Sequence, residues 1–395
     1  MSSAQTDPSR PLVVWQAGVA WDGVTGTDWH LVNHLSRHVD VLWVDPPVSI
    51  VTPLRARQRP ALRPRLDVVA PRITRLRCSA PPFAFRPGLD RITVALARAA
   101  IRSSLGHLEQ VPEAVVSTSP LPALDVVARA RRIYFATDDF SAGAELMGKR
   151  ARRFQQIEQR RVREADVLGA VSPEIVARWA PVEQPTFVLP NGCDVQHFAG
   201  VETAPLPTDV SLPRPIIGLV GQLTPRIDLS LLEAVADAGM SLLLVGPRQV
   251  DFEPQRVRRL LERANVVAVG QKRFEELPSY LRMIDVGLTP YTGDAFNLAS
   301  FPLKTLEYLS AGRPVVSTPL PAVERLAAPG VRTAATPDEF VTAVRSTLAA
   351  QVAHPGASEE LRSFARRHDW SARAATFLAD TGLDRDLPGV RGAGR

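Results

Sequence analysis

The sequence has little cysteine, few aromatic residues and no long apolar run. Its 395 residues include two cysteines, Cys78 and Cys193, and neither has neighbours at the spacing of metal ligands. We therefore expect reduced thiols and no metal site. No apolar stretch approaches the about 20 residues that span a bilayer, and the first residues lack the basic and apolar segments of a secretory signal. These absences predict a globular cytoplasmic protein.

Positive charge is unevenly distributed along the chain. Residues 1–200 hold 25 lysines and arginines against 19 acidic residues, whereas residues 201–395 hold 22 of each. The excess lies in two stretches, residues 55–77 and 149–163, and the second predicts a basic helix. A solvated face, contact with anionic membrane lipid and nucleic-acid binding are all open for it. Because these stretches lack interleaved aromatic residues and a nucleic-acid-binding motif, we expect no nucleic-acid partner.

Two missing motifs narrow the classes of function further. No GxGxxG turn with a later acidic ribose partner is found, which argues against a dinucleotide-dependent oxidoreductase. His30, His34 and His38 recur at four-residue intervals, but no HExxH motif accompanies them. We therefore favour packing or surface histidines over a zinc site. His30, nearest the start of its predicted helix, is the one expected to reach a binding site.

Apolar β-branched runs alternate with helical patterns along both halves of the chain. The alternation predicts parallel sheets covered by helices on both faces. Predicted strands lie at residues 12–15, 40–45, 73–77, 114–118, 132–136, 166–171, 186–189, 216–220, 241–245, 266–269, 285–288 and 314–318. Predicted helices include residues 88–105, 121–129, 142–164, 229–238, 255–264 and 277–283. Residues 48–68 are expected to form a long loop or a poorly ordered excursion.

The composition also suggests domain boundaries. A Pro-rich stretch precedes Ile216, where the strand and helix pattern restarts. We therefore predict a first domain at residues 11–193, a linker at 194–215 and a second domain at 216–369. A C-terminal helix at residues 370–382 is expected to pack back on the first domain, and residues 383–395 are expected to be a disordered tail.

Polar residues follow two predicted strands of the first domain. The loop after residues 12–15 contains Gly23 and Gly26, and Thr27 or Asp28 is expected to cap the next helix. Because ligands bind at the carboxyl ends of parallel strands, this loop should face a binding cleft.

Asp138 and Asp139 follow the strand at residues 132–136. One of the two is placed for general-base catalysis on a hydroxyl group. Two alternatives remain open: Asp139 or Ser141 caps the helix at residues 142–164, or the carboxylates bind a divalent metal, although no third ligand is evident.

The stretch FNLASFPLKTLEYLSAGRPVVST, residues 296–318, combines a loop, a helix and a strand. Pro302 suits the start of the helix and Gly312 its end. Lys304 and Glu307 lie three residues apart, on one face near the helix N-terminus, where an anion is favoured. A lysine with free backbone amides suits a diphosphate, and the carboxylate suits a ribose diol. A solvated surface helix is the alternative.

Several motifs together resemble a known family. The segments GQLTPRID, LVGP, NVVAVGQ, DVGLTPY and FPLKTLEYLSAGRPVVST resemble, in this order, the donor half of GT-B glycosyltransferases of the family 4, or group 1, type. YFATDDFSAG and VLPNGCDVQHF are similar to segments of bacterial cell-surface polysaccharide transferases, especially the teichuronic acid transferase-like branch. The resemblance spans residues 11–380.

The resemblance implies an α/β GT-B fold, with two Rossmann-like parallel-sheet domains facing a central cleft. It implies transfer of a sugar from a nucleotide-diphosphate sugar to a lipid-linked, polysaccharide or other hydroxyl acceptor, without metal or cofactor. The first domain would bind the acceptor and the second the donor. Such a protein would act in cell-envelope polysaccharide biosynthesis, at the inner face of the plasma membrane, with its basic half as a peripheral contact to anionic lipid.

The resemblance also implies roles for individual residues. Glu307 would hold the ribose, while Arg226, Lys304 and the backbone N–H groups of Leu303 and Lys304 would bind the diphosphate. Gly221, Gly270 and Gln271 would border the nucleotide. On the acceptor side, the implied residues are Gly23, Gly26, Asp28, His30, Asp138 and Asp139, with Asn191 near the interdomain hinge.

The sequence departs from the family at one position. The family carries two glutamates eight positions apart in this block, and Ala299 stands eight positions before Glu307. Asp294 or Asn297 is a nearby candidate for the missing group. The departure leaves open whether the anomeric configuration is retained or inverted. It also leaves open a non-catalytic GT-B protein that binds a nucleotide, a glycan or a partner transferase.

Overall fold

The computed structural model describes residues 10–23, 25–49, 64–82, 88–121, 123–146, 151–354 and 356–384. The chain divides into two compact units. The first unit is formed by Met1–Pro190 and Ser371–Arg395, and the second by Asn191–Trp370. Within the described residues, no helix is both long and apolar enough to cross a membrane.

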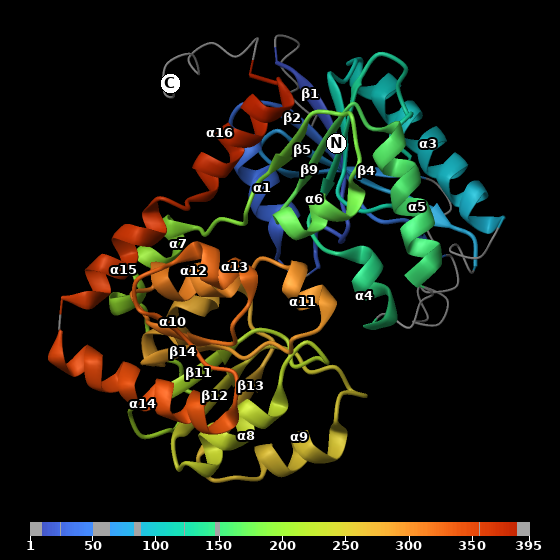
Figure 1. The fold of residues 1–395 in the computed structure, drawn as a ribbon. Coiled ribbons are helices and arrows are strands. Elements are labelled where there is room, and N and C mark those ends of the chain that lie inside the picture. Colours follow the sequence, from blue (N-terminus) through green and yellow to red (C-terminus); the bar gives the residue numbers. More distant parts are fainter. Residues whose placement is uncertain are drawn as a thin grey trace. The chain divides into compact units, whose positions relative to one another are not determined.

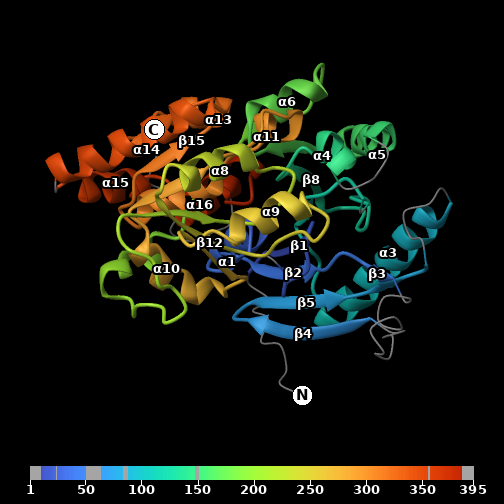
Figure 2. The ribbon, with the colours of Figure 1, turned by 90° about the horizontal axis from the view of Figure 1, so that it is seen from below.

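The first unit contains an eight-stranded sheet in the order β10-β9-β8-β7-β1-β2-β5-β4, in which only the β4 and β5 pair is antiparallel. Figure 2 shows β5 and β4 at one edge of it. The strands are β1 Leu12–Gln16, β2 Asp40–Val44, β4 Arg65–Ala70, β5 Ile73–Arg77, β7 Ala114–Ser117, β8 Arg131–Ala136, β9 Val167–Ala170 and β10 Thr186–Val188. A small separate ladder pairs β3 Val48–Ser49 with β6 Ser79–Ala80. The helices are α1 Thr27–Leu35, α3 Leu89–Leu108, α4 Phe140–Leu146, α5 Ala151–Glu164, α6 Pro173–Trp179 and most of α16 Trp370–Thr381.

Helix α16 packs on the core of the first unit. The ring of Phe377 lies 5.5 Å from that of Trp15, 5.7 Å from that of Phe135 and 5.9 Å from that of Phe187, measured between centroids. Strands β1 and β2 are buried along their whole length, because a parallel sheet covered on both faces has no solvated side. The C-terminal helix therefore completes the first unit's core.

The second unit contains a six-stranded parallel sheet in the order β13-β12-β11-β14-β15-β16. Figure 1 shows α8, α9 and α14 on one side of this sheet and α12 and α15 on the other. The strands are β11 Ile216–Val220, β12 Ser241–Val245, β13 Val266–Gly270, β14 Val286–Thr289, β15 Val315–Ser317 and β16 Val331–Thr333. The helices are α7 Val195–Ala199, α8 Leu229–Asp237, α9 Pro254–Leu261, α10 Leu277–Met283, α11 Ala295–Ala299, α12 Leu303–Ser310, α13 Pro321–Leu326, α14 Pro337–Ala353 and α15 Ala357–Arg366, with short 3₁₀ turns at Val201–Thr203 and Phe274–Glu276.

The predicted linker at residues 194–215 differs from the structure. Its first part forms α7 and a 3₁₀ turn, and Phe198 and Val201 are fully buried in the core of the second unit. The boundary between the units lies at Pro190, so the predicted limit at residue 193 was three residues too late. Phe198 and Val201, three residues apart, pack against the face of the second sheet that α12 and α15 also cover.

Three further sequence predictions need correction. Residues 123–129 are irregular rather than helical: two prolines in the sequence just before them disfavour a helix, and the side chain of Gln16 donates to the carbonyl of Ala123 at 2.9 Å. The helix predicted at 142–164 is two helices, α4 and α5. The loop predicted at 48–68 contains β3 and the start of β4, while its residues 50–63 lie outside the described part, as do residues 385–395 of the predicted tail.

Both cysteines are buried and unbridged. Burial raises the pKa of the Cys78 thiol to about 11, and the charge of Asp45 acts in the same direction. Burial also raises the pKa of Cys193 above its usual range, helped by the charges of Asp369 and Glu307. The two thiols are therefore protonated at neutral pH, which keeps them unreactive.

Candidate functional site

Three glycines end three adjacent strands of the second unit. The N–H of Gly221 donates to the carbonyl of Val245 at 2.9 Å, and the N–H of Gly246 donates to that of Gly270 at 2.9 Å. At Gly246 φ is 147°, and a Cβ there would lie 1.9 Å from the carbonyl oxygen of Gly221. Only glycine fits this position. The strands therefore end in a bare backbone edge, which is where ligands bind in open α/β sheets.

Helix α12 is held against this sheet by Tyr308. The Tyr308 hydroxyl accepts the N–H of Val220 at 2.6 Å and donates to the carbonyl of Gly218 at 3.1 Å. A Cβ at Gly287 would lie 2.5 Å from the Tyr308 ring, so glycine is needed for the close approach. Because α12 connects two parallel strands, it runs antiparallel to them. Its N-terminus therefore lies at the carboxyl edge of the sheet.

The first turn of α12 carries the predicted diphosphate-binding groups. Leu303 and Lys304 begin the helix after Pro302, and no described side chain caps it. Such a helix start offers backbone N–H groups and a positive dipole end to an anion. The ammonium of Lys304 donates to the Glu307 carboxylate at 2.7 Å, and Glu307 is 3% exposed. The three-residue spacing therefore brings these two side chains together, as predicted.

Arg226 lies in the loop between β11 and α8, at the same edge. Its Nε donates to Oδ1 of Asn297 at 3.0 Å, and its guanidinium carbon lies 4.5 Å from the ring centroid of Phe296 and 5.5 Å from that of Tyr291. Asn297 is fully buried and donates back to the Arg226 carbonyl at 3.0 Å. These contacts fix the loop and the plane of the guanidinium. They use Nε and not the two terminal nitrogens, which suit bidentate binding of phosphate.

The helix α11, which sequence reasoning missed, contains the buried Ala299. Asp294 caps α11 by accepting the N–H of Asn297 at 2.9 Å, and the Asn297 amide also donates to the carbonyl of Thr292 at 3.1 Å. Both candidates for the missing carboxylate therefore have internal partners. In the structure, Asp294 and Asn297 hold the loop that contains Arg226.

Two of the other predicted residues of the second unit, Gly270 and Gln271, lie at the end of β13. Gly270 has a φ of 70°, and Gln271 after it is exposed. Asn191 is the first residue of the second unit, and its side-chain amide donates to the carbonyl of Phe301 at 3.1 Å. Asn191 thus supports the segment that leads into α12.

In the first unit, Asp28 is a buried carboxylate rather than a helix cap. Its Oδ2 accepts the N–H of Gly18 and the hydroxyl of Thr118, both at 2.9 Å, and its Oδ1 accepts the indole N–H of Trp15 at 3.3 Å. Burial raises the pKa of Asp28 to about 6; the three hydrogen bonds oppose this shift, and the charge of Asp138 adds to it. Asp28 therefore joins the carboxyl ends of β1 and β7.

The glycines of the β1–α1 loop form its turns. Gly23 donates its N–H to the carbonyl of Ala20 at 2.8 Å, in a tight turn. Gly26 is the N-cap residue of α1, without a side-chain cap among the described residues. The prediction that Thr27 or Asp28 caps this helix is wrong, because both lie within α1 and Asp28 is turned toward Gly18.

The adjacent aspartates after β8 have different surroundings. Asp139 is 1% exposed; its Oδ1 accepts the N–H of Ala142 at 2.7 Å, which caps α4, and its Oδ2 forms an ion pair with Arg178. This is the capping alternative named above. Asp138 is half-buried, and its charge acts on Asp28. The predicted general-base role of this pair stays a prediction.

The histidines of α1 are packing residues by their burial. His30 is 2% exposed and His34 8%, and the ring of His30 meets that of Trp29 edge-on at 5.2 Å. Among the described residues, no group of three or more His, Cys, Asp or Glu side chains could hold a metal ion. The expectation that His30 reaches a binding site stays a prediction, and its ring is buried beside Trp29.

Sequence reasoning missed the network that orders the β1–α1 loop. Asp45, after β2, accepts the N–H of Trp21 at 3.0 Å and the indole N–H of Trp43 at 2.8 Å, and it pairs with the buried Arg75 at 2.7 Å. Arg75 also pairs with Asp22 at 2.7 Å. The aspartate that ends the DVLWVD segment is the only local sequence feature that indicates this network, because Arg75 comes from another strand, 30 residues away.

Comparisons with known proteins agree with this geometry. The family described as "Glycosyl transferases group 1" matches residues 214–350, within the second unit. TuaH of Bacillus subtilis (strain 168), assigned to teichuronic acid biosynthesis as a glycosyltransferase, is 29% identical over 204 residues, which cover 49% of this chain and 50% of TuaH. The match therefore spans about half the length of that relative.

Solved structures resemble the chain over nearly its full length. Sucrose-phosphate synthase from Thermosynechococcus elongatus superposes with a TM-score of 0.74 at 17% identity, covering 94% of this chain and 98% of that one. HepE from Anabaena, solved with UDP and glucose, gives a TM-score of 0.66 at 15% identity, over 94% and 100% of the two chains. WaaG, a glycosyltransferase of lipopolysaccharide biosynthesis, gives 0.64 at 15% identity, over 95% and 100%. The predicted GT-B fold is confirmed. The solved structures therefore show that the chain has the GT-B fold, and residues 214–350 of its second unit resemble the group 1 glycosyltransferase family.

Proposed function

We propose that the chain transfers a sugar from a nucleotide-diphosphate sugar to a hydroxyl acceptor, with the donor bound by the second unit. One observation carries the proposal. Two cations, an uncapped helix start and a buried carboxylate gather at the carboxyl edge of the six-stranded sheet, through Arg226, Leu303, Lys304 and Glu307. This set matches the charge and the hydroxyl groups of a ribonucleoside diphosphate.

The chemistry of transfer explains why cations are needed there. As the bond between the sugar and the diphosphate breaks, negative charge develops on the leaving oxygen. Preorganised donors aimed at that charge lower the barrier. Arg226 and Lys304 would bind the diphosphate, while Glu307 would accept hydrogen bonds from the ribose hydroxyls. These side chains supply positive charge themselves, and we include metal independence in the proposal.

Uridine nucleotides are the first donors to test, because HepE was solved with UDP and with UDP-glucose. Teichuronic acid biosynthesis is the assigned role of TuaH. We therefore include a cell-envelope polysaccharide, or its lipid-linked precursor, as the acceptor. The first unit, with Asp138 and its ordered β1–α1 loop, would bind it.

The surface of α3 supports a peripheral contact with an anionic membrane as part of this proposal. Ile92 and Leu96 lie one turn apart and are 50% and 49% exposed. The exposed Arg91 and Arg102 lie on the same helix. A helix that carries both basic residues and exposed aliphatic side chains favours the interface of an anionic bilayer.

The proposal is tested by binding and turnover together. Thermal shift with a panel of nucleoside diphosphates should raise the melting temperature with at least one of them. Incubation of the matching nucleotide sugars should release nucleoside diphosphate slowly, and addition of EDTA should leave the rate unchanged. A protein that binds a nucleotide but hydrolyses none of its sugars, with or without an added acceptor extract, would instead be a non-catalytic GT-B protein, which Ala299 favours.

A further inference from the structure

Two tryptophans of the first unit keep ring surface exposed where β1 and β2 end. Trp21 lies in the loop between β1 and α1, and Trp29 lies in the first turn of α1; both are half-buried, whereas Trp15 and Trp43 are fully buried. The ring centroids of Trp21 and Trp29 are 5.9 Å apart, and the two rings are tilted by 42°. We call these two residues the aromatic pair. They lie at the edge of the sheet where ligands bind in open α/β folds.

Internal contacts hold Trp21 in place. Its backbone N–H donates to Oδ1 of Asp45 at 3.0 Å, and the same oxygen accepts the indole N–H of Trp43 at 2.8 Å. The ring of Trp43 packs against that of Trp21 at 5.1 Å between centroids, with an angle of 83° between the planes. The protein therefore fixes the orientation of the aromatic pair itself, which lowers the entropic cost of binding a ligand there.

A carboxylate next to the aromatic pair is both held and exposed. The side chain of Asp22 is 70% exposed, yet its Oδ2 is paired with the buried guanidinium of Arg75 at 2.7 Å. Arg75 also pairs with Asp45 at 2.7 Å. Two carboxylates thus share one guanidinium, and two negative charges with one positive charge leave the group formally negative. Like charge disfavours a phosphate or a carboxylate here, whereas a hydroxyl group can donate to Asp22.

An uncharged sugar ring matches both features. A pyranose has C–H groups with partial positive charge on its flat faces and hydroxyl groups around its rim. The faces of indole rings are negative and attract such C–H groups, while a carboxylate accepts hydrogen bonds from the rim. An alkyl chain would use the rings but not the carboxylate.

We infer that Trp21 and Trp29 bind an uncharged pyranose ring of the acceptor, with Asp22 accepting a hydrogen bond from one of its hydroxyl groups. This inference rests on the proposed function, which leaves open the charge of the acceptor sugar and the residues that select it. The aromatic pair determines specificity: it favours a neutral sugar ring at this position and disfavours a uronic acid or a sugar phosphate.

Fluorine NMR of the full chain labelled with fluorotryptophan tests the inference. The signals of Trp21 and Trp29 are assigned from Trp21→Phe and Trp29→Phe. The chain is titrated with methyl glucoside, methyl galactoside and methyl N-acetylglucosaminide, and we expect at least one of them to shift both signals saturably. Methyl glucuronide adds a charge, and sorbitol has hydroxyl groups without the ring. Both should bind at least about fivefold more weakly than the best neutral glycoside.

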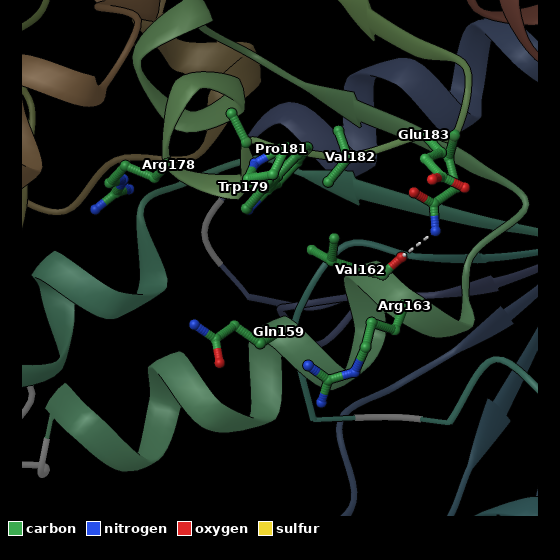
Figure 3. Close-up of a pocket in the computed structure, with 10 residues that line it drawn as sticks. Gln159, Val162, Arg163, Arg178, Trp179, Pro181, Val182 and Glu183 are labelled. Carbon is green, nitrogen blue, oxygen red and sulfur yellow. Dashed lines mark hydrogen bonds between the residues drawn. The ribbon is translucent and has the colours of Figure 1, made fainter.

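Substitution of Trp21 tests the site itself, with binding followed at the Trp29 signal. Trp21→Ala should weaken binding of the best glycoside at least about fivefold, and Trp21→Phe, which keeps a ring, should weaken it less. Trp179→Ala is the matched control and should change binding less than about twofold. Trp179 is also half-buried in the first unit, but it lines a separate pocket of about 690 Å³ between α5, α6 and the segment before β10 (Figure 3).

Each probe has a result that overturns the inference. If none of the neutral glycosides shifts the two signals, the aromatic pair does not bind a sugar, whether or not Trp21→Ala folds. Equal binding of methyl glucuronide excludes selection by charge, and equal binding of sorbitol excludes ring stacking. Equal effects of Trp21→Ala and Trp179→Ala place the sugar elsewhere. Nucleotide binding is measured on the same samples; a chain that binds nucleotide but no glycoside refutes this inference alone, and the reverse result refutes the proposed donor site alone.

Discussion

The two units use charged side chains at their strand ends in opposite ways. In the first unit, carboxylates stand at the carboxyl edge, and Asp28, Asp45 and Asp139 each accept several hydrogen bonds from backbone, indole or guanidinium groups. In the second unit, Arg226 and Lys304 stand at this edge beside an uncapped helix. The carboxylates of the first edge accept hydrogen bonds from its own loops, whereas the second edge combines two cations with the uncapped N–H groups of α12.

This difference shows how an aspartate that follows a predicted strand should be interpreted. Long loops at a strand end contain many N–H groups, and a buried N–H that finds no acceptor costs about 1–3 kcal/mol. An aspartate is the shortest side chain that can accept several of them at once. Its presence after a strand therefore indicates loop order as readily as general-base catalysis. Arg226 and Lys304 also have internal partners, Asn297 and Glu307, but a guanidinium and an ammonium carry more N–H donors than one such contact uses.

The largest expected effect comes from removing a cation of the second unit. Arg226→Ala or Lys304→Ala should each lower kcat/KM for the nucleotide sugar by about 10²–10³-fold, as loss of a transition-state donor does elsewhere. Lys304→Ala also leaves the buried carboxylate of Glu307 without its observed partner. Steady-state kinetics measures both.

Arg258→Ala is the matched control, because Arg258 is exposed on α9 and does not lie at the strand ends. Its kinetics should equal those of the wild type. If kcat/KM changes less than threefold in both Arg226→Ala and Lys304→Ala, then the two cations do not serve the donor, and the proposed difference between the two edges is wrong.

The next effect concerns the pH dependence of the first unit. The pKa of Asp28 is about 6 in the folded protein, against a usual 3.8. The folded state therefore binds this proton more tightly than the unfolded chain. Raising the pH from about 4 to about 6 should lower the free energy of unfolding by up to about 3 kcal/mol through this group, at about 1.4 kcal/mol per pKa unit.

Asp28→Asn isolates this contribution, because an amide does not titrate. The free energy of unfolding of the wild type minus that of Asp28→Asn should fall as the pH rises through this window and stay constant above it. Urea denaturation at four pH values from 4 to 7 measures the difference, and Asp251→Asn, at an exposed position of the second unit, is the control. A difference that does not change with pH would show that Asp28 is solvated.

Local patterns predicted the second unit well, and for a physical reason. The strands at residues 216–220 and 241–245 and the helix at 277–283 have the predicted bounds, because buried parallel strands and proline-started helices are visible in short windows. Lys304 and Glu307 were paired from a helical spacing alone. The helix α11 was not predicted, because its five residues are too few to show a helical hydrophobic period.

Non-local partners explain what the sequence did not reveal. Asp28 was read as a cap, but its acceptor task depends on Thr118, 90 residues away. Asp139 binds Arg178 of α6, and residues of α7 fill a core face rather than link domains. The pocket beside α5 likewise depends on segments that meet only in the folded unit. No window of sequence contains these pairs.

The smallest expected effect is the difference in stability between variants of the adjacent Asp138 and Asp139. It tests whether the carboxylates of the first unit order their own loops. Asp139→Ala removes a cap and an ion pair, and should lower the free energy of unfolding by about 2 kcal/mol. Asp138→Ala removes neither of these two contacts and should lower the free energy of unfolding by less than Asp139→Ala does. Urea denaturation at pH 7 compares them, with kinetics on the same samples. If Asp138 is the general base, its variant is stable but loses turnover. If Asp139→Ala keeps full stability and Asp138→Ala keeps full activity, then the first edge does not order its own loops, and Asp139 must be available to the acceptor after all.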